Sequence, residues 1–476
     1  MKFNPVTQND LEAFARMLPA HAMVTDTTEK LAYGSDETED FCFPPEVVLF
    51  PESTAQVSDI LAYCHQRHIP VTTRGAGTGL SGGALPVYGG VCLSMKKMNQ
   101  ILKIDTENLQ VQTQPGVITQ VLQETVAAHG LFYPPDPSSR GSCFIGGNIA
   151  ENAGGPRAVK YGVTKDWVLN LEAVLADGTI LETGANVLKN ATGYNLTQLL
   201  VGSEGTLAVV TKAVLKLIPH PTLQWVMLVP FYHAKDACVA VNAIFQAGIT
   251  PSAMEFMERD ALDWTLKYKP EIRMEIPSDI QAHLLIEIDG FREEELMAQA
   301  EAIHQTLAHF HTGEFLLATA AAEKEALWKL RRSVGEAVKS NSVYKEEDTV
   351  VPRFKLPELL ETVKRIGQQY GFTSVCYGHA GDGNLHVNII RGNLPGEVWE
   401  KTLPMAIREL FTEVRAMGGT LSGEHGIGWV QKNYMDLVFS QPHLQLMQHI
   451  KACFDPKGIL NPGKIFPDQM VETTKT

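Results

Sequence analysis

The sequence contains few cysteines, and their spacing forms no motif. Seven cysteines are scattered over 476 residues, and no two of them form a C-x-x-C pair. An odd, scattered set argues against a disulfide framework and favours a reducing compartment. The same spacing excludes the usual Cys-rich iron–sulfur cluster and a C-x-x-C-H haem attachment site.

Long apolar runs are also missing. No stretch approaches the roughly 20 apolar residues that a transmembrane helix needs. The first residues, MKFNPVTQND, contain no apolar signal core. We therefore expect no membrane span and a cytoplasmic location.

Positive charge is scarce as well. The chain has 40 Lys and Arg against 54 Asp and Glu, a formal net charge of −14. A broad negative field repels phosphate backbones, and no basic tract is present, so no nucleic acid partner is expected. An anionic substrate is not excluded, because a local cluster of Arg and Lys can outweigh a distant net charge. The length predicts two or three domains.

Short β-rich runs alternate with amphipathic helices in the first half of the chain. Residues 46–50 and 69–73 are typical of strands, and residues 118–129 of a helix. Between the two strands, Ser53 and Gln56 have the spacing of a capping box that begins another helix. The apolar residues on one face of that helix are Val57, Ile60, Leu61 and Cys64. This alternation predicts an α+β or α/β domain.

The glycine density drops from about residue 221. Residues 225–231 and 283–289 are typical of strands, and residues 293–309 of a helix. A second α+β domain is therefore predicted over 221–425. The tail, 426–476, is predicted to be mostly helical.

The segment Arg74–Gly83 has five glycines in ten residues. Gly77, Gly79 and Gly82 satisfy G-x-G-x-x-G after a strand, but a Rossmann motif must open a helix, and Pro86 soon breaks one. A compact loop of backbone N–H groups around a pyrophosphate fits better, because glycine permits close approach and positive φ. A plain surface turn is the alternative.

Three further glycine-rich segments follow the first one. The second comprises residues 134–140, 145–155 and 160–162, the third comprises 193–206, and the fourth comprises 455–466. A single segment of this kind is a weak signal. Four of them in this order are a strong one.

Together these segments resemble the vanillyl-alcohol oxidase/p-cresol methylhydroxylase superfamily of flavoproteins. Within it, the chain is similar to the group of glycolate oxidase flavoprotein subunits, D-lactate dehydrogenases and D-2-hydroxyglutarate dehydrogenases. The resemblance implies an α+β fold with a two-subdomain FAD-binding domain of the PCMH type at 1–220. A ferredoxin-like cap domain would occupy 221–425, and 426–476 would return to complete the FAD site.

The resemblance also assigns FAD-contacting positions, which cover all four segments. They are Arg74, Gly75, Ala76, Gly77, Thr78, Gly79, Leu80, Ser81, Gly82, Pro135, Asp136, Ser138, Gly146, Gly147, Asn148, Asn152, Gly155, Tyr161, Gly162, Ser203, Glu204, Gly205 and Asn461. Some superfamily members attach FAD covalently through a His in the first loop. Thr78 stands at that place, so non-covalent FAD is implied.

The second domain contains a group of metal-ligand types. His379, His386 and Glu424 supply two imidazoles and a carboxylate, a plausible set for a divalent metal. His386 shares one face of a predicted strand with Asn388, and residues 381–384 must turn or bulge to bring His379 near. The alternative is that each His is a structural hydrogen-bonding residue.

The resemblance favours the metal and assigns roles around it. Similar members bind a divalent metal, commonly zinc, through the corresponding His/His/Glu set. His425 is then the candidate base, or instead orients Glu424. Arg331 takes the position that binds the substrate carboxylate, which a guanidinium grips in two places. Lys345 and Asn388 complete the expected catalytic group; for Lys345, as for Arg331, the alternative is a solvated surface charge.

The resulting hypothesis is an FAD-dependent dehydrogenase that oxidises a small D-2-hydroxy acid, glycolate or D-lactate, by hydride transfer to flavin N5. D-2-hydroxyglutarate dehydrogenase is the rival, weakened by Gly335 at a place where such members carry a substrate-holding Thr. A flavin subunit that is active only in a multi-subunit complex is the other alternative. An iron–sulfur subunit or an electron-transfer flavoprotein is the expected electron acceptor, and a homodimer stays open.

Overall fold

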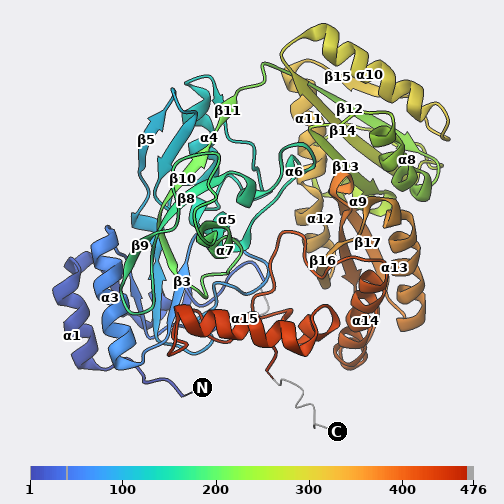
Figure 1. Ribbon diagram of the computed structural model, residues 1–476. Coiled ribbons are helices and arrows are strands. Elements are labelled where there is room, and N and C mark those ends of the chain that lie inside the picture. The colour runs from blue at the N-terminus through green and yellow to red at the C-terminus, as the bar shows by residue number, and fades with distance from the viewer. Residues whose placement is uncertain (1, 39–40, 469–476) are drawn as a thin grey trace. The chain divides into compact units, whose positions relative to one another are not determined.

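The computed structural model describes residues 2–38 and 41–468, which form two compact units (Figure 1). The first unit contains residues up to 154, 163–220 and the described residues from 424 onward. The second contains 155–162 and 221–423. The short segment 155–162, which the sequence assigned to the first domain, therefore groups with the second unit.

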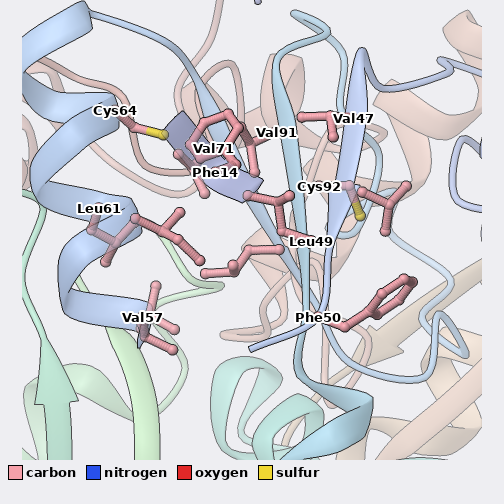
Figure 2. Close-up of a cluster of buried hydrophobic side chains, with 14 of the residues drawn as sticks. Phe14, Val47, Leu49, Phe50, Val57, Leu61, Cys64, Val71, Val91 and Cys92 are labelled. Carbon is pink, nitrogen blue, oxygen red and sulfur yellow. The ribbon is translucent and has the colours of Figure 1, made fainter. Parts of the chain in front are cut away.

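A four-stranded sheet forms one layer of the first unit. Its order is β1-β2-β4-β3, with β1 antiparallel to β2 and the other pairs parallel. The strands are β1 (Met23–Val24), β2 (Val47–Leu49), β3 (Val71–Arg74) and β4 (Val91–Ser94). The helices of this layer are α1 (Gln8–Met17), α2 (Thr27–Leu31) and α3 (Thr54–Arg67). Side chains of the sheet, α1 and α3 build a continuous apolar core (Figure 2).

Helix α3 begins as the sequence predicts. The hydroxyl of Ser53 accepts a hydrogen bond from the backbone N–H of Gln56 at 3.3 Å. The Gln56 side chain, however, accepts from the N–H of Glu52 at 2.7 Å, one residue before the N-cap. The four residues predicted to share one face are all buried, so the helical period is confirmed.

A five-stranded antiparallel sheet forms the other layer of the first unit, in the order β5-β6-β10-β8-β9. Its strands are β5 (Ile101–Asp105), β6 (Gln110–Thr113), β8 (Val168–Val174), β9 (Ile180–Glu182) and β10 (Val209–Lys216). A separate pair joins β7 (Leu131–Phe132) to β11 (Ile218–Pro219). The helices here are α4 (Thr119–Ala127), α5 (Ile145–Glu151) and α7 (Leu196–Leu200).

The C-terminal segment returns to the first unit, as predicted. After α15 (Gln441–Phe454), the backbone of Val71 donates to the carbonyl of Ile459 and accepts from the N–H of Asn461, each at 2.8 Å. These bonds place the last glycine-rich segment beside β3, directly before the first glycine loop.

The second unit is built on a seven-stranded antiparallel sheet in the order β15-β12-β14-β13-β17-β18-β16. The strands are β12 (Leu223–Phe231), β13 (Ala253–Glu258), β14 (Ala282–Gly290), β15 (Leu316–Ala318), β16 (Tyr344–Val350), β17 (Thr373–Gly378) and β18 (Asn384–Ile390). The helices are α6 (Ala158–Tyr161), α8 (Ala234–Gln246), α9 (Arg259–Tyr268), α10 (Glu293–Leu307), α11 (Ala321–Arg332), α12 (Val334–Asn341), α13 (Leu356–Tyr370) and α14 (Gly396–Ala416). An α+β fold is thus confirmed. Across the described residues, no helix is both long and apolar enough to cross a membrane.

Candidate flavin and substrate sites

The first glycine loop leaves β3 without entering a helix, which confirms that it is not a Rossmann turn. Gly77 and Gly82 have φ of +77° and +74°, a conformation that favours glycine. A Cβ on Gly77 would lie 2.1 Å from Nη2 of Arg74, so the glycine lets this guanidinium fold over its own loop. Arg74 is buried, and its Nη1 has no hydrogen-bond partner within the described chain.

Asn461 joins the first, third and fourth glycine segments. Its side-chain amide donates to the carbonyls of Gly83 at 2.9 Å and Glu204 at 2.8 Å. The carboxylate of Glu204 in turn accepts the N–H groups of Ile427 at 2.8 Å and Gly428 at 2.7 Å. Residues far apart in sequence are therefore held together by side-chain to backbone bonds.

The second segment contacts the third through α5. The N–H groups of Gly202 and Glu204 donate to the carbonyls of Ile149 and Ala150, each at 2.8 Å. A Cβ on Gly75 would approach the backbone N of Gly147 to 3.6 Å. Residues of all four glycine segments thus come together within the first unit, although Gly155 and residues 160–162 of the second segment belong to the second unit. Pro135, Asp136 and Ser138 lie in the loop between β7 and α5.

Two glycines of these loops face open space. A Cβ on Gly79 or Gly147 would meet no atom within 4 Å, and neither residue has a positive φ. The buried hydroxyl of Ser81 has no hydrogen-bond partner within the described chain. The backbone at these two glycines has open space beside it, and the Ser81 hydroxyl and Nη1 of Arg74 have no hydrogen-bond partner within the described chain. These features fit a phosphate-bearing cofactor that the main chain approaches closely.

A cluster of ionisable side chains, Glu151, Glu204, Lys464 and Asp36, lies beside the converging loops, and only Glu204 among them was identified from the sequence. Burial and the nearby charge of Glu204 raise the pKa of Glu151 well above its ordinary value. Burial also lowers the pKa of Lys464 to about 7, although Glu204 and Asp36 oppose that shift. Lys464 donates to the carbonyl of Leu85 at 2.6 Å, which ties the C-terminal segment to the first loop.

In the second unit, His379 and His386 lie on the hairpin of β17 and β18. The predicted turn between them is confirmed as a short 3₁₀ helix, Ala380–Asp382, followed by Gly383 at φ +76°. Both histidines are buried, and their ring centroids lie 5.3 Å apart. Nδ1 of His386 lies 3.1 Å from a carboxylate oxygen of Glu346 on β16.

Glu255, on β13, was not found from the sequence. Its carboxylate is fully buried, and Nδ1 of His379 lies 2.8 Å from Oε1 and 2.9 Å from Oε2. Nη2 of Arg331 lies 2.7 Å from Oε2. Burial acts to raise the pKa of Glu255, but its interactions with His379 and Arg331 outweigh burial and hold the pKa below its ordinary value. No motif surrounds Glu255 that could have identified it.

Arg331 lies in the last turn of α11 and is only 5% exposed. Its guanidinium is 5.0 Å from the centre of the Tyr377 ring. Within the described chain, Nε and Nη2 make no aligned hydrogen bond, although Nη2 is at ion-pair distance from Glu255. The solvated surface charge considered as an alternative is therefore excluded, and donors remain for an anionic ligand.

The register of β16 and β18 shows on which face Lys345, a catalytic candidate by resemblance, lies. Lys345 pairs with Ile389, whereas Glu346 pairs with Asn388 and Asp348 with His386. Paired residues of an antiparallel sheet share a face, and neighbours along a strand alternate. Lys345 therefore lies on the face opposite His386 and Asn388, and Glu346 lies on theirs. A one-residue error in register is enough to reverse the face.

The other predicted residues divide between the two units. Gly155, Tyr161 and Gly162 belong to the second, where the Tyr161 hydroxyl donates to Asp289 at 2.7 Å. Glu424 and His425 begin the segment that returns to the first unit, and a Cβ on Gly154 would lie 3.1 Å from Oε2 of Glu424. The preceding residue, Gly423, donates its N–H to Asp348 at 2.8 Å in the second unit.

Two family models match the sequence. The FAD binding domain matches residues 45–184, and the C-terminal domain of FAD linked oxidases matches residues 220–465. The chain belongs to the FAD-linked oxidases. It is accordingly a flavoprotein oxidoreductase with an FAD-binding domain of the PCMH type.

Curated relatives cover nearly the whole chain. The glycolate oxidase subunit GlcD of Bacillus subtilis (strain 168) is 40% identical over 92% of this chain and 92% of its own. A D-lactate dehydrogenase of Anaerostipes hadrus is 36% identical over 98% of each. A D-2-hydroxyglutarate dehydrogenase of Stutzerimonas stutzeri (strain A1501) is 35% identical over 93% of this chain and 96% of its own.

Solved structures show the same fold at low identity. Substrate-bound p-cresol methylhydroxylase superposes with a TM-score of 0.78 at 18% identity, covering 98% of this chain and 99% of its own. The superfamily fold expected from the glycine segments is therefore confirmed.

Proposed function

We propose that this protein is an FAD-dependent dehydrogenase that oxidises a small D-2-hydroxy acid, glycolate or D-lactate, to the 2-oxo acid. The observation that carries the proposal is the buried Arg331. Its Nε makes no hydrogen bond within the described chain, and its Nη2 contacts the same carboxylate, Glu255, as His379 does. A buried cation with free donors beside imidazoles suits a substrate that combines a carboxylate with a hydroxyl. Relatives named for glycolate, D-lactate and D-2-hydroxyglutarate support the same class.

The flavin is proposed to bind without a covalent link. The converging glycine loops supply backbone groups, and Thr78 offers no imidazole for attachment. Acid precipitation of the yellow protein should release all of its colour into solution. Flavin that stays with the pellet would contradict the non-covalent link.

A divalent metal, with zinc as the first candidate, is proposed for the two histidines. The ligand set proposed from the sequence is His379, His386 and Glu424, and the alternative set is Glu346, His386 and His425. With Nδ1 of His379 on Glu255, its Nε2 is left as the ligand atom. Metal analysis of Glu424→Gln and Glu346→Gln separates the two sets, and we expect only the first to lose metal. Active enzyme without a divalent ion would refute the site.

The chain's own residues have separate proposed roles in the oxidation. A metal held by His379, His386 and Glu424 would supply polarisation of the substrate hydroxyl, and FAD would supply the acceptor, at flavin N5, for the hydride from C2. Arg331 binds and orients the carboxylate, and His425 is proposed to take the hydroxyl proton or to orient Glu424. The buried amide oxygen of Asn388 has no partner within the described chain and could accept a hydrogen bond from substrate.

A substrate panel with an artificial dye as electron acceptor tests the proposal. Glycolate or D-lactate should be oxidised faster than D-2-hydroxyglutarate, because Gly335 gives a long dicarboxylate no side chain to hold it. The competing activity is favoured if D-2-hydroxyglutarate is preferred. If neither glycolate nor D-lactate is oxidised, with the dye or with oxygen as acceptor, the alternative of a subunit that is inactive without its partners is favoured.

The same preparation tests where the electrons go. The described chain provides no Rossmann turn at its first glycine loop for a nicotinamide, so we expect no activity with NAD. We propose an iron–sulfur subunit or an electron-transfer flavoprotein as the acceptor, with fast dye reduction and slow oxygen consumption. The name of the Bacillus subtilis relative, a subunit, supports a partner. Peroxide formed as fast as dye is reduced would remove the need for one.

A further inference from the structure

Glu255 is the one buried carboxylate on the sheet that contacts both a proposed metal ligand and the proposed carboxylate-binding cation. Its Oε1 and Oε2 lie 2.8 Å and 2.9 Å from Nδ1 of His379, and Oε2 lies 2.7 Å from Nη2 of Arg331. The three residues come from β13, α11 and the turn after β17. All belong to the second unit, so their contacts do not depend on the first.

We infer that Glu255 is a positioning residue that couples metal binding to substrate binding through its contacts with His379 and Arg331. The inference rests on the proposed function. As an acceptor for Nδ1–H, Glu255 selects the tautomer of His379 that leaves Nε2 unprotonated. As the partner of Arg331, it fixes one side of the guanidinium, so that the other donors stay oriented for a substrate carboxylate.

The chemistry of the two partners makes the charge of Glu255 necessary. His379 and Arg331 both present N–H groups to Glu255, and an ionised carboxylate can accept on both oxygens. A Gln at this position has nearly the same shape, but it is neutral and has one acceptor oxygen, so its interactions with both partners are weaker. Glu255→Gln should therefore loosen both the imidazole and the guanidinium without opening a cavity.

A matched control lies on the same strand. Glu258, three residues along β13, is also buried, but its carboxylate pairs with Lys364 at 2.7 Å and accepts the N–H of Cys376 at 3.0 Å. Alternation along the strand puts it on the face opposite Glu255. Glu258→Gln therefore removes a buried carboxylate without touching His379 or Arg331.

The first measurement is Zn²⁺ affinity, by competition with a chromophoric chelator on the FAD-loaded full chain without substrate. We expect Glu255→Gln to weaken binding by about 10–100-fold, the usual cost of losing a partner of a metal-ligating His. Glu258→Gln should bind Zn²⁺ as the wild type does. Equal affinity in Glu255→Gln and wild type would overturn the role toward His379.

The second measurement is a double-mutant cycle on KM at saturating Zn²⁺. Glu255→Gln should raise KM for the hydroxy acid about tenfold in the wild-type background and leave it unchanged in an Arg331→Ala background. Equal effects in both backgrounds would overturn the role toward Arg331. The double variant also guards against misfolding, because it leaves no unpaired buried charge.

The outcomes separate this inference from the proposed function. A wild-type chain that binds Zn²⁺ and oxidises hydroxy acids, with Glu255→Gln silent in both measurements, overturns the inference alone. A wild-type chain that binds no divalent metal overturns the proposed metal site and the His379 role together. The KM cycle then decides the Arg331 role by itself.

Discussion

In the first unit the candidate flavin site is made by the main chain, whereas in the second the candidate substrate site is made by side chains. The flavin loops meet through backbone carbonyls and N–H groups held by Asn461 and Glu204. The candidate substrate site rests on buried charged and imidazole groups on and beside the antiparallel sheet, among them Glu255, Arg331 and His379. A glycine loop is recognisable from local sequence, but partners brought together by a sheet are not.

The largest expected effect tests whether the two sites can be separated. His386→Ala removes a proposed metal ligand, and we expect kcat to fall by about 1,000-fold or more, because a metal contributes several kcal/mol to stabilising the transition state. FAD content should change little, since most of the proposed FAD-contacting residues belong to the first unit. Dye-coupled assays and the flavin absorbance measure both quantities.

The matched control for that variant is His443→Ala, which removes an exposed histidine that contacts Ser440. It should keep both activity and flavin. If His386→Ala loses its flavin together with its activity, the two sites are not independent and the comparison fails.

Arg331→Ala tests the side-chain site from the substrate's side. A hydrogen bond to a charged group contributes about 1.5–3 kcal/mol, so KM for the hydroxy acid should rise roughly 10–100-fold, with a smaller change in kcat. The adjacent Arg332 is exposed and lies 5.1 Å from the Trp328 ring, so Arg332→Ala is the control and should leave KM unchanged. An unchanged KM in Arg331→Ala would reduce the pair with Glu255 to a structural role.

The sequence predicted much of this molecule because several of its signals are local. The capping residue Ser53, the apolar face of α3 and the turn before β18 each depend on neighbours along the chain, and each is confirmed. The four glycine segments are likewise recognisable from their own residues, because backbone conformations such as the positive φ of Gly77 favour glycine at those positions.

The sequence failed where the answer depends on register or on distant strands. Lys345 and Glu346 differ by one position, yet only the pairing of β16 with β18 shows which one shares a face with His386. Glu255 lies 76 residues before Arg331 and 124 before His379, and only the sheet order brings it to them. Segment 155–162 follows the second glycine loop in sequence but groups with the other unit, as the ion pair of Lys160 with Asp289 illustrates.

The glycine loops offer a subtler test of a site made by the main chain. Gly79→Ala and Gly147→Ala add a methyl group where no protein atom lies within 4 Å, and neither glycine has a positive φ. The free energy of unfolding of the apoprotein should therefore change by less than about 0.5 kcal/mol in Gly79→Ala, and rise by up to about 1 kcal/mol in Gly147→Ala, because Gly147 lies inside α5. FAD affinity should nevertheless fall about tenfold, because the loss of one good contact costs about 1.4 kcal/mol.

Titration of deflavinated protein with FAD measures that affinity by quenching of flavin fluorescence. Gly396→Ala is the control, because Gly396 also faces open space but lies on α14 of the second unit. It should leave FAD affinity unchanged. Unaltered affinity in both loop variants would show that the backbone does not approach the cofactor at these positions.

The smallest expected effect is on the pH dependence of stability, and it comes from His283, a buried ionisable residue of the second unit without a counter-charge among the described residues. His283 on β14 is 5% exposed, and its Nδ1 has no hydrogen-bond partner within the described chain. Burial, aided by the positive charge of Arg259, lowers the pKa of His283 to about 4. Glu255 of β13 and Arg331 of α11 are also buried but pair with each other, which is why they can stay charged in the same unit.

The lowered pKa of His283 makes stability depend on pH in a defined direction. Between about pH 6.5 and 4 the unfolded chain takes up a proton that the folded chain refuses, so the free energy of unfolding falls as the pH falls through this window. At pH 5 the loss should be about 1–2 kcal/mol. His283→Gln, neutral at every pH, should lose correspondingly less stability between pH 7 and pH 5 than the wild type in urea titrations. His304→Gln, which replaces an exposed histidine of α10, should follow the wild-type curve. If His283→Gln also follows it, the sheet tolerates the charged imidazole, and pairing is not what distinguishes the charged residues of the substrate site.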